Sequence, residues 1–125
     1  MDITPLVADD SNIINSYGDG GFTVNKIRYN NSIFITPNLL IELSDIKTFA
    51  ELKISDLEKI ISYKEPIDIL LIGTGEKHFF IPPEIKNFSL QNNINCETMN
   101  TGAASRTYNV LLTEERKVAA FLIAI

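Results

Sequence analysis

Two short segments carry residue types that bind anions through the backbone. Gly73-Thr74-Gly75 follows an apolar run, and Thr101 opens a segment rich in small residues. A glycine turn leaves amide hydrogens unobstructed, and the start of a helix adds unpaired amides and the positive end of the helix dipole. If the strands before both segments run parallel, the segments meet at one edge of the sheet, where open α/β sheets bind ligands. The pattern predicts a notch for phosphate or carboxylate, with a tight turn against closely packed small residues as the alternative.

Arg106 is the cation expected to border this notch. It lies near the start of the predicted helix, where a positive charge opposes the helix dipole at a cost of about 0.3–1 kcal/mol. A bound anion, a carboxylate of a partner or an internal acid such as Glu97 would offset that cost. Gly102, Arg106 and Asn109 share one helical face, so Arg106 and Asn109 are expected to contact the same ligand or partner. An ordinary internal salt bridge is the alternative explanation.

The usual catalytic and metal-binding sets are missing from the sequence. His78 is the only histidine and Cys96 the only cysteine, and no acid pairs with either at a recognisable spacing. We therefore expect no catalytic residues, no metal site and no cofactor. His78 also stands where a dinucleotide-binding fingerprint needs its third glycine. Tyr108 is a further candidate for contact with a ligand or partner, although packing in the core is the favoured interpretation.

The apolar pattern predicts the elements that hold these segments. The first third is rich in strand patterns, namely 13–17, 22–24 continuing through 27–29, and 32–36, with turns at 18–21 and Asn30-Asn31 and a stop at Pro37. Helices are expected to begin at Ser55, at Pro82 and after a cap at Thr101, and they alternate with buried strands at 67–72, 94–98 and 118–123. This order predicts a single three-layer α/β domain with a mixed central β-sheet, packed helices and a β-rich N-terminal third.

Local signals mark the ends and the faces of the helices. Ser55 and Glu58 have the spacing of a capping box, and Pro66 is expected to end the first helix. Its apolar face is expected to consist of three residues, Leu57, Ile60 and Ile61. The second helix is expected to bury Ile85 and Phe88, and the third to bury Ala104, Thr107, Tyr108, Leu111 and Leu112.

Length and composition limit the classes of function. The 125 residues, 45% hydrophobic with a net charge of −5, fit one domain at 13–125 after a flexible arm at 1–12. The negative charge argues against a nucleic-acid partner. The arm contains no Lys or Arg, unlike a signal peptide or presequence, so a cytoplasmic location is expected. No transmembrane segment is expected, since the longest apolar run, 118–125, is far shorter than the ~20 residues that a spanning helix needs.

Two motifs carry a resemblance to a known family. The first is Ser16-Tyr17-Gly18-Asp19-Gly20-Gly21-Phe22, and the second runs from Glu97 to Leu111 around Ala103-Ala104-Ser105-Arg106-Thr107-Tyr108-Asn109. With 69–75 and 116–120 they resemble the family of mitochondrial complex I assembly factor 3 and its prokaryotic relatives, the Mth-type domains of unknown function. The resemblance covers about residues 13–124. It implies a three-layer α/β fold, no established enzymatic activity, and a protein partner in a respiratory complex or a second assembly factor.

Two functions from different classes follow from these observations. The favoured one is a non-catalytic protein-interaction domain, an assembly factor for respiratory complex I or another membrane-associated oxidoreductase. It would dock its partner near Arg106 and Asn109 or through the β-rich first third. The other is a small-molecule binding protein or enzyme that holds an anion with 73–75 and Arg106. The sequence leaves the partner, the ligand and a homo-oligomeric state open.

Overall fold

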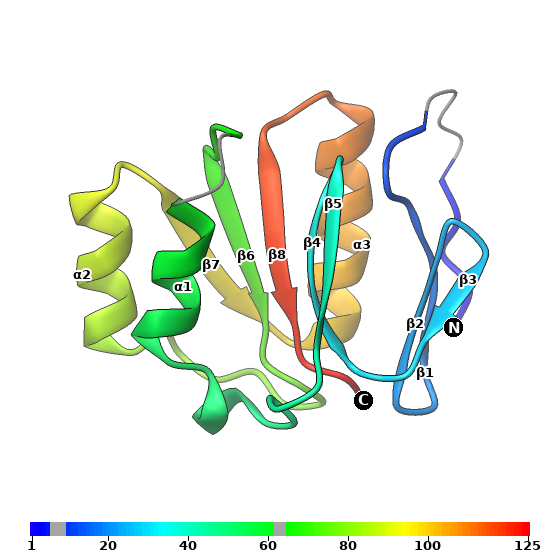
Figure 1. Cartoon of the computed structure of the whole chain (residues 1–125), viewed down its shortest axis with the longest axis horizontal. Coiled ribbons are helices and arrows are strands. Elements are labelled where there is room, and N and C mark those ends of the chain that lie inside the picture. The colour runs from blue at the N-terminus through cyan, green and yellow to red at the C-terminus, as the bar shows by residue number, and fades with distance from the viewer. Residues whose placement is uncertain (6–9, 62–64) are drawn as a thin grey trace.

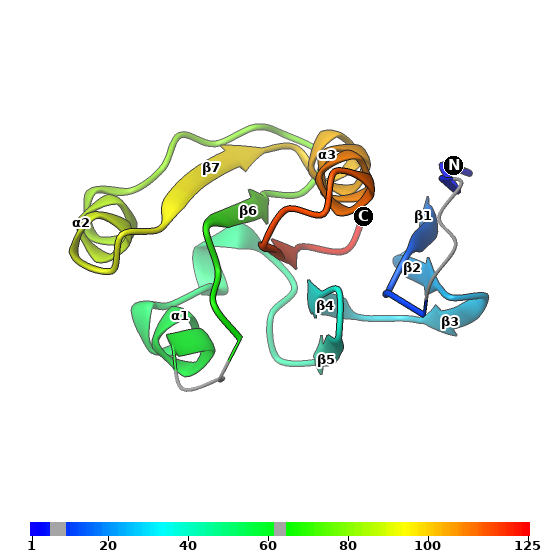
Figure 2. The same ribbon diagram turned by 90° about the horizontal axis from the view of Figure 1, so that it is seen from above.

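The computed structural model describes residues 1–5, 10–61 and 65–125, with the backbone alone at 60 and 61. It confirms the predicted mixed α/β fold. A five-stranded sheet of order β5-β4-β8-β6-β7 has helices on both faces, and a three-stranded sheet of order β1-β2-β3 lies beside it (Figures 1 and 2). The expected packing of Ile60 and Ile61 concerns side chains outside the described ones.

The small antiparallel sheet contains two hairpins. Its strands are β1 (Ile14–Gly18), β2 (Gly21–Val24) and β3 (Ile27–Tyr29). The prediction that 27–29 continues the strand before it is wrong, because the chain reverses between β2 and β3. Asn25 and Lys26 have φ values of 47° and 69°. Positive φ at both central residues is typical of the two-residue hairpin turns that fit twisted strands.

The Asn30-Asn31 segment links the two sheets. β4 (Ser32–Thr36) pairs with β5 (Leu39–Leu43) and β8 (Val118–Leu122), so the predicted hairpin turn at Asn30-Asn31 is wrong. Every residue of β4 is buried, and such a strand needs cover on both faces, which the central sheet provides. No strand was predicted at β5, because Pro37 suggested an end where the chain instead turns into a hairpin.

The second half has the predicted β-α-β-α-β order. It consists of β6 (Ile69–Gly73), α2 (Pro83–Gln91), β7 (Asn95–Met99), α3 (Thr101–Thr113) and β8. β6 pairs in parallel with β7 on one side and β8 on the other. The chain thus moves outward through α2 and returns across β6 through α3. Right-handed crossovers in opposite directions place the two helices on opposite faces, as Figure 2 shows. The carboxyl ends of the three parallel strands share one edge.

The helix starts differ from the prediction by a residue or more. α1 (Ile54–Ile61) already contains Ser55, and the acid at its start is Asp56, whose Oδ2 accepts from the Lys53 amide at 2.9 Å. The expected Ser55–Glu58 box is therefore wrong. A comparable arrangement lies in the 3-10 turn η1 (Phe49–Glu51), where Glu51 Oε1 accepts from the Thr48 amide at 3.0 Å.

Two apolar cores sandwich the central sheet. Alternate residues of each central strand face opposite ways, so Ile33, Ile35 and Leu71 pack with α3 and the small sheet. Phe34 and Leu70 pack on the other side with α1 and α2. On that side Ile85 and Phe88 are buried, as predicted.

The described start of the chain lies along β1. The Ile3 amide donates to Asn15 O at 2.8 Å, and the Tyr17 amide donates to Met1 O at 3.1 Å. The flexibility expected of residues 1–12 stays a prediction, and residues 6–9 lie outside the described part of the chain.

Candidate functional site

A cavity of about 560 Å³ opens at the edge where the parallel strands end. This volume falls within the range of roughly 300–1,000 Å³ typical of ligand pockets. Three segments far apart in the sequence form its wall: the η1 turn, the loop after β6 and the chain after β8. Its lining residues are Lys47, Thr48, Phe49, Ala50, Thr74, Gly75, Glu76, Lys77, Phe79, Ile123, Ala124 and Ile125.

The glycine turn and the start of α3 meet, as the sequence predicted. A Cβ added to Gly73 would lie 3.0 Å from both Cα and Oγ1 of Thr101, so the missing side chain allows this close approach. Thr101 Oγ1 accepts from the Gly75 amide at 3.0 Å and donates to Ile123 O at 2.7 Å. One hydroxyl thus joins the β6 turn, α3 and the end of β8.

The amides at this junction already donate within the chain. The Thr74 amide donates to Met99 O and the Thr101 amide to Gly75 O, both at 2.8 Å. The Ala103 amide donates to Oδ1 of Asn100, which caps α3 in place of the predicted Thr101. The expected notch of unobstructed amides is therefore not formed, and a tight turn packed against small residues describes the junction. Any binding role of Gly73, Thr74, Gly75 and Thr101 stays a prediction.

Arg106 does not border the glycine turn. Its guanidinium carbon lies 5.5 Å from the centroid of the Tyr17 ring, and its Nη2 donates to the sulfur of Met1. Together with Ile3 and Pro5 it lines a separate cavity of about 360 Å³. Arg106 is the sixth residue of α3, beyond the first turn where the dipole acts, and the ring stabilises its charge. These contacts offset the charge within the chain, and a bound anion at Arg106 stays a prediction.

Asn109 and Tyr108 are structural residues of the α3 core face. Asn109 is buried, its Oδ1 accepts from the Ile14 amide at 3.1 Å, and its Nδ2 donates to Ile14 O at 2.8 Å. Asn109 nevertheless lines the same cavity as Arg106, so a shared binding role of the two residues stays a prediction. Tyr108 is fully buried and donates to Asn12 O at 2.8 Å. Burial raises the pKa of its phenol. The core interpretation of Tyr108 is confirmed.

An exposed aromatic loop, residues 76–81, borders the cavity. The Phe79 ring is 49% exposed and stacks on Phe49 of η1, with centroids 6.0 Å apart. Phe80 is 87% exposed, and its ring lies 5.4 Å from that of His78. The sequence reasoning missed this loop. Its signal is a pair of consecutive phenylalanines between a glycine turn and Pro82, where no helix or strand pattern provides a buried face.

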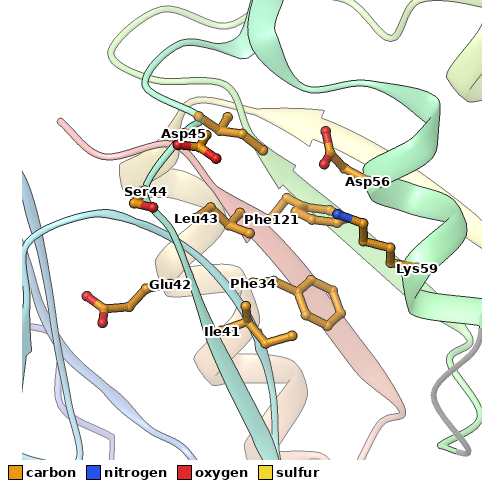
Figure 3. A pocket seen from close by; sticks show the side chains of 10 residues that line it. Phe34, Ile41, Glu42, Leu43, Ser44, Asp45, Asp56, Lys59 and Phe121 are labelled. Atoms are coloured by element: carbon orange, nitrogen blue, oxygen red, sulfur yellow. The ribbon is translucent and has the colours of Figure 1, made fainter.

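A second cavity of about 230 Å³ lies between β5 and α1. Figure 3 shows Asp45 after β5 and Asp56 on α1, and the rings of Phe34 and Phe121, with centroids 4.7 Å apart, form part of the wall. Over the described ranges, no group of three or more His, Cys, Asp or Glu side chains could hold a metal ion. The cavity beside the aromatic loop is the stronger candidate site, because the loop after β6 and the chain after β8, which follow the carboxyl ends of two parallel strands, line it directly.

The single cysteine and the single histidine of the chain show no sign of activation for catalysis. Burial raises the pKa of the Cys96 thiol to about 12, so the thiol is protonated at neutral pH. His78 Nε2 lies 3.4 Å from Thr98 Oγ1 at an exposed position, which is longer than a typical hydrogen bond. The aromatic loop and its cavity can offer apolar contact and positive charge, the chemistry of recognition.

The sequence between 14 and 123 matches the model of a protein family described as "Protein of unknown function (DUF498/DUF598)". The chain belongs to this family. One relative, 32% identical over 86% of both chains, is named a 13 kDa major membrane protein of Francisella tularensis subsp. holarctica (strain LVS). Another, 26% identical over 97% of this chain and 67% of its own length, is named NADH dehydrogenase [ubiquinone] 1 alpha subcomplex assembly factor 3 of Xenopus tropicalis.

The fold of this DUF498/DUF598 member has solved counterparts. The solution structure of a Bordetella pertussis protein, described as a Mth938-like domain, superposes with a TM-score of 0.80 at 26% identity. The match covers 98% of this chain and 92% of that one. The resemblance to the assembly-factor family and to Mth-type domains is thereby confirmed. In the described part of the chain, no helix combines the length and apolar content required to cross a bilayer.

Proposed function

We propose that this chain is a non-catalytic interaction domain that takes part in assembling respiratory complex I or another membrane-associated oxidoreductase. The name of the Xenopus relative supports the assembly role, and the name of the Francisella relative supports action beside a membrane. The observation that carries the proposal is the aromatic loop, where Phe79 lines a cavity and the next residue, Phe80, is exposed. Exposed apolar patches on small domains are typical of protein-binding surfaces.

The position of the aromatic loop favours a docking role over a structural one. Phe80 is 87% exposed, so its ring contributes little to the core. Aromatic side chains are enriched among the few residues that dominate binding energy at interfaces. Phe79 is held by its stacking on Phe49, which orders the loop before any partner binds. A preorganised loop loses less conformational entropy on association.

Quantitative affinity purification tests this proposal. A tagged chain is isolated from its own cells beside a Phe80→Ser variant and an Ile27→Ser control, which removes a residue 57% exposed on the small sheet. We expect the parent and the Ile27→Ser control to enrich the same oxidoreductase subunits. Phe80→Ser should lower that enrichment by about tenfold or more, because an aromatic side chain that the partner buries at the interface contributes about 2 kcal/mol or more to binding. A parent chain that enriches no such subunit contradicts the proposal.

Binding of a small anionic molecule is the second candidate function. It is supported by the cavity volume and by Lys47 and Lys77 in its wall. A ligand at a hundredfold excess over its Kd stabilises a protein by about 2.7 kcal/mol. Phosphate, sulfate or a nucleotide should then raise the Tm of the parent and of an Arg106→Ala control, and Lys77→Gln should diminish the rise. A flat thermal-shift screen over these three anions excludes this function.

A further inference from the structure

We propose that the partner enters the cavity beside the aromatic loop as an extended segment with one apolar side chain flanked by carboxylates. The inference rests on the proposed function and names the chemistry of the partner. Stacked rings, an aliphatic wall and two ammonium groups line one concave surface. Rings and aliphatic groups accept an apolar side chain, and the ammonium groups pair with acids. A segment that carries both matches the site.

The apolar part of the cavity fits an anchoring side chain. Phe49, Phe79 and Ile123 line it from three separate segments of the chain. The Phe49 and Phe79 rings lie within 17° of parallel, and Phe79 stays 49% exposed. A ring or branched aliphatic chain of a partner can therefore extend the stack and cover the remaining face. The cavity volume of about 560 Å³ exceeds that of any single side chain, so neighbouring backbone also enters.

The charged part of the cavity selects acidic flanks. Among the described lining residues Lys47 and Lys77 are the cations and Glu76 is the charged side chain of opposite sign. The chain as a whole carries a net charge of −5, so this region departs locally from the overall sign. The Lys47 amide donates to Glu51 Oε1 at 3.0 Å, so a carboxylate already lies beside Lys47. Lys77 is therefore the cation more available to a partner, and complementary charge favours acidic over basic segments.

Titrations followed by ¹H–¹⁵N NMR of the full chain test this inference. The probes are acetyl-Asp-Glu-Leu-Phe-Asp-Glu-amide, its counterpart with lysine in place of every acid, and hydrocinnamate. We expect the acidic peptide to shift the amides of Phe49, Gly75 and Phe79, and the lysine peptide to bind at least about fivefold more weakly. Lys77→Glu should weaken the acidic peptide about three- to tenfold. Lys117→Glu, an exposed control where β8 begins, should leave its affinity unchanged.

Three results overturn the inference. The first is equal binding of the acidic and lysine peptides, and the second is no shift at these amides at millimolar peptide. The third is tighter binding of hydrocinnamate than of the acidic peptide, which would assign the cavity to a small ligand. The affinity purification separates this failure from that of the proposed function. If Phe80→Ser still loses the oxidoreductase subunits while the acidic peptide does not bind as expected, docking through the aromatic loop is supported and the proposed acidic segment is wrong. If the parent enriches no subunit, the proposed function itself fails.

Discussion

Replacement of Asn109 by leucine should destabilise the domain by about 4 kcal/mol. The side chain satisfies the amide and the carbonyl of Ile14 at 3.1 and 2.8 Å, in a buried position between α3 and β1. Leucine has a similar shape but offers neither the hydrogen-bond acceptor nor the donor that the Ile14 backbone needs. Each buried backbone group left unsatisfied costs about 1–3 kcal/mol, and the two together cost about 2–6 kcal/mol. A domain of this size typically has only about 5–15 kcal/mol of stability.

Urea unfolding followed by circular dichroism measures this loss. At roughly 4 °C per kcal/mol, the Tm should fall by roughly 15 °C, and the Ile14 amide should exchange with solvent faster. Asn87→Leu makes the same substitution on the exposed face of α2 and should change stability by less than about 0.5 kcal/mol. A loss below about 1 kcal/mol for Asn109→Leu, or one equal to that of Asn87→Leu, refutes the bridging role.

Three further outcomes are expected. Gly21→Ala should cost about 3 kcal/mol in urea unfolding, because an added Cβ would overlap the backbone carbonyl oxygen of Tyr29; a change below about 0.5 kcal/mol contradicts this packing. Cys96, with a thiol pKa of about 12, should react with iodoacetamide at pH 8 about a thousandfold more slowly than free cysteine; a rate near that of free cysteine shows an open thiol. The pKa of Glu51 is lowered, first by the hydrogen bond from the Lys47 amide, so its stabilisation is present above the unfolded pKa and lost as pH falls through the folded pKa. Melting curves of the parent and Glu51→Gln should therefore differ most near neutral pH and converge in acid, and a gap independent of pH would exclude this role.

The second half of the fold was predictable because its signals are local. The apolar run at 69–72 and the i, i+3, i+4 spacing around Tyr108 define a buried strand and a helix face without knowledge of the rest. The β2–β3 turn was missed because Lys26 adopts a positive φ that sequence patterns assign to Gly or Asn. The strand β5 was not predicted because Pro37, which suggested that the strand pattern ends there, lies in the turn between β4 and β5.

The candidate site was predictable only in part. The meeting of Gly73 with Thr101 follows from parallel strands and glycine spacing. The contact between Phe49 and Phe79 joins segments thirty residues apart and depends on how η1 folds over the sheet, which no local pattern encodes. The prediction placed Arg106 beside the glycine turn. Its actual contact, the ring of Tyr17, belongs to the other sheet, and no local pattern encodes that contact.

Photocrosslinking inside cells tests the docking role of the aromatic loop most directly. p-Benzoylphenylalanine replaces Phe80 in one variant and Ile27, on the small sheet, in the other. After irradiation, mass spectrometry identifies the adducts formed by each chain. We expect position 80 to capture a subunit of a respiratory complex or another membrane-associated oxidoreductase, and position 27 to capture none. No such adduct from position 80, or equal capture from position 27, would contradict the docking role.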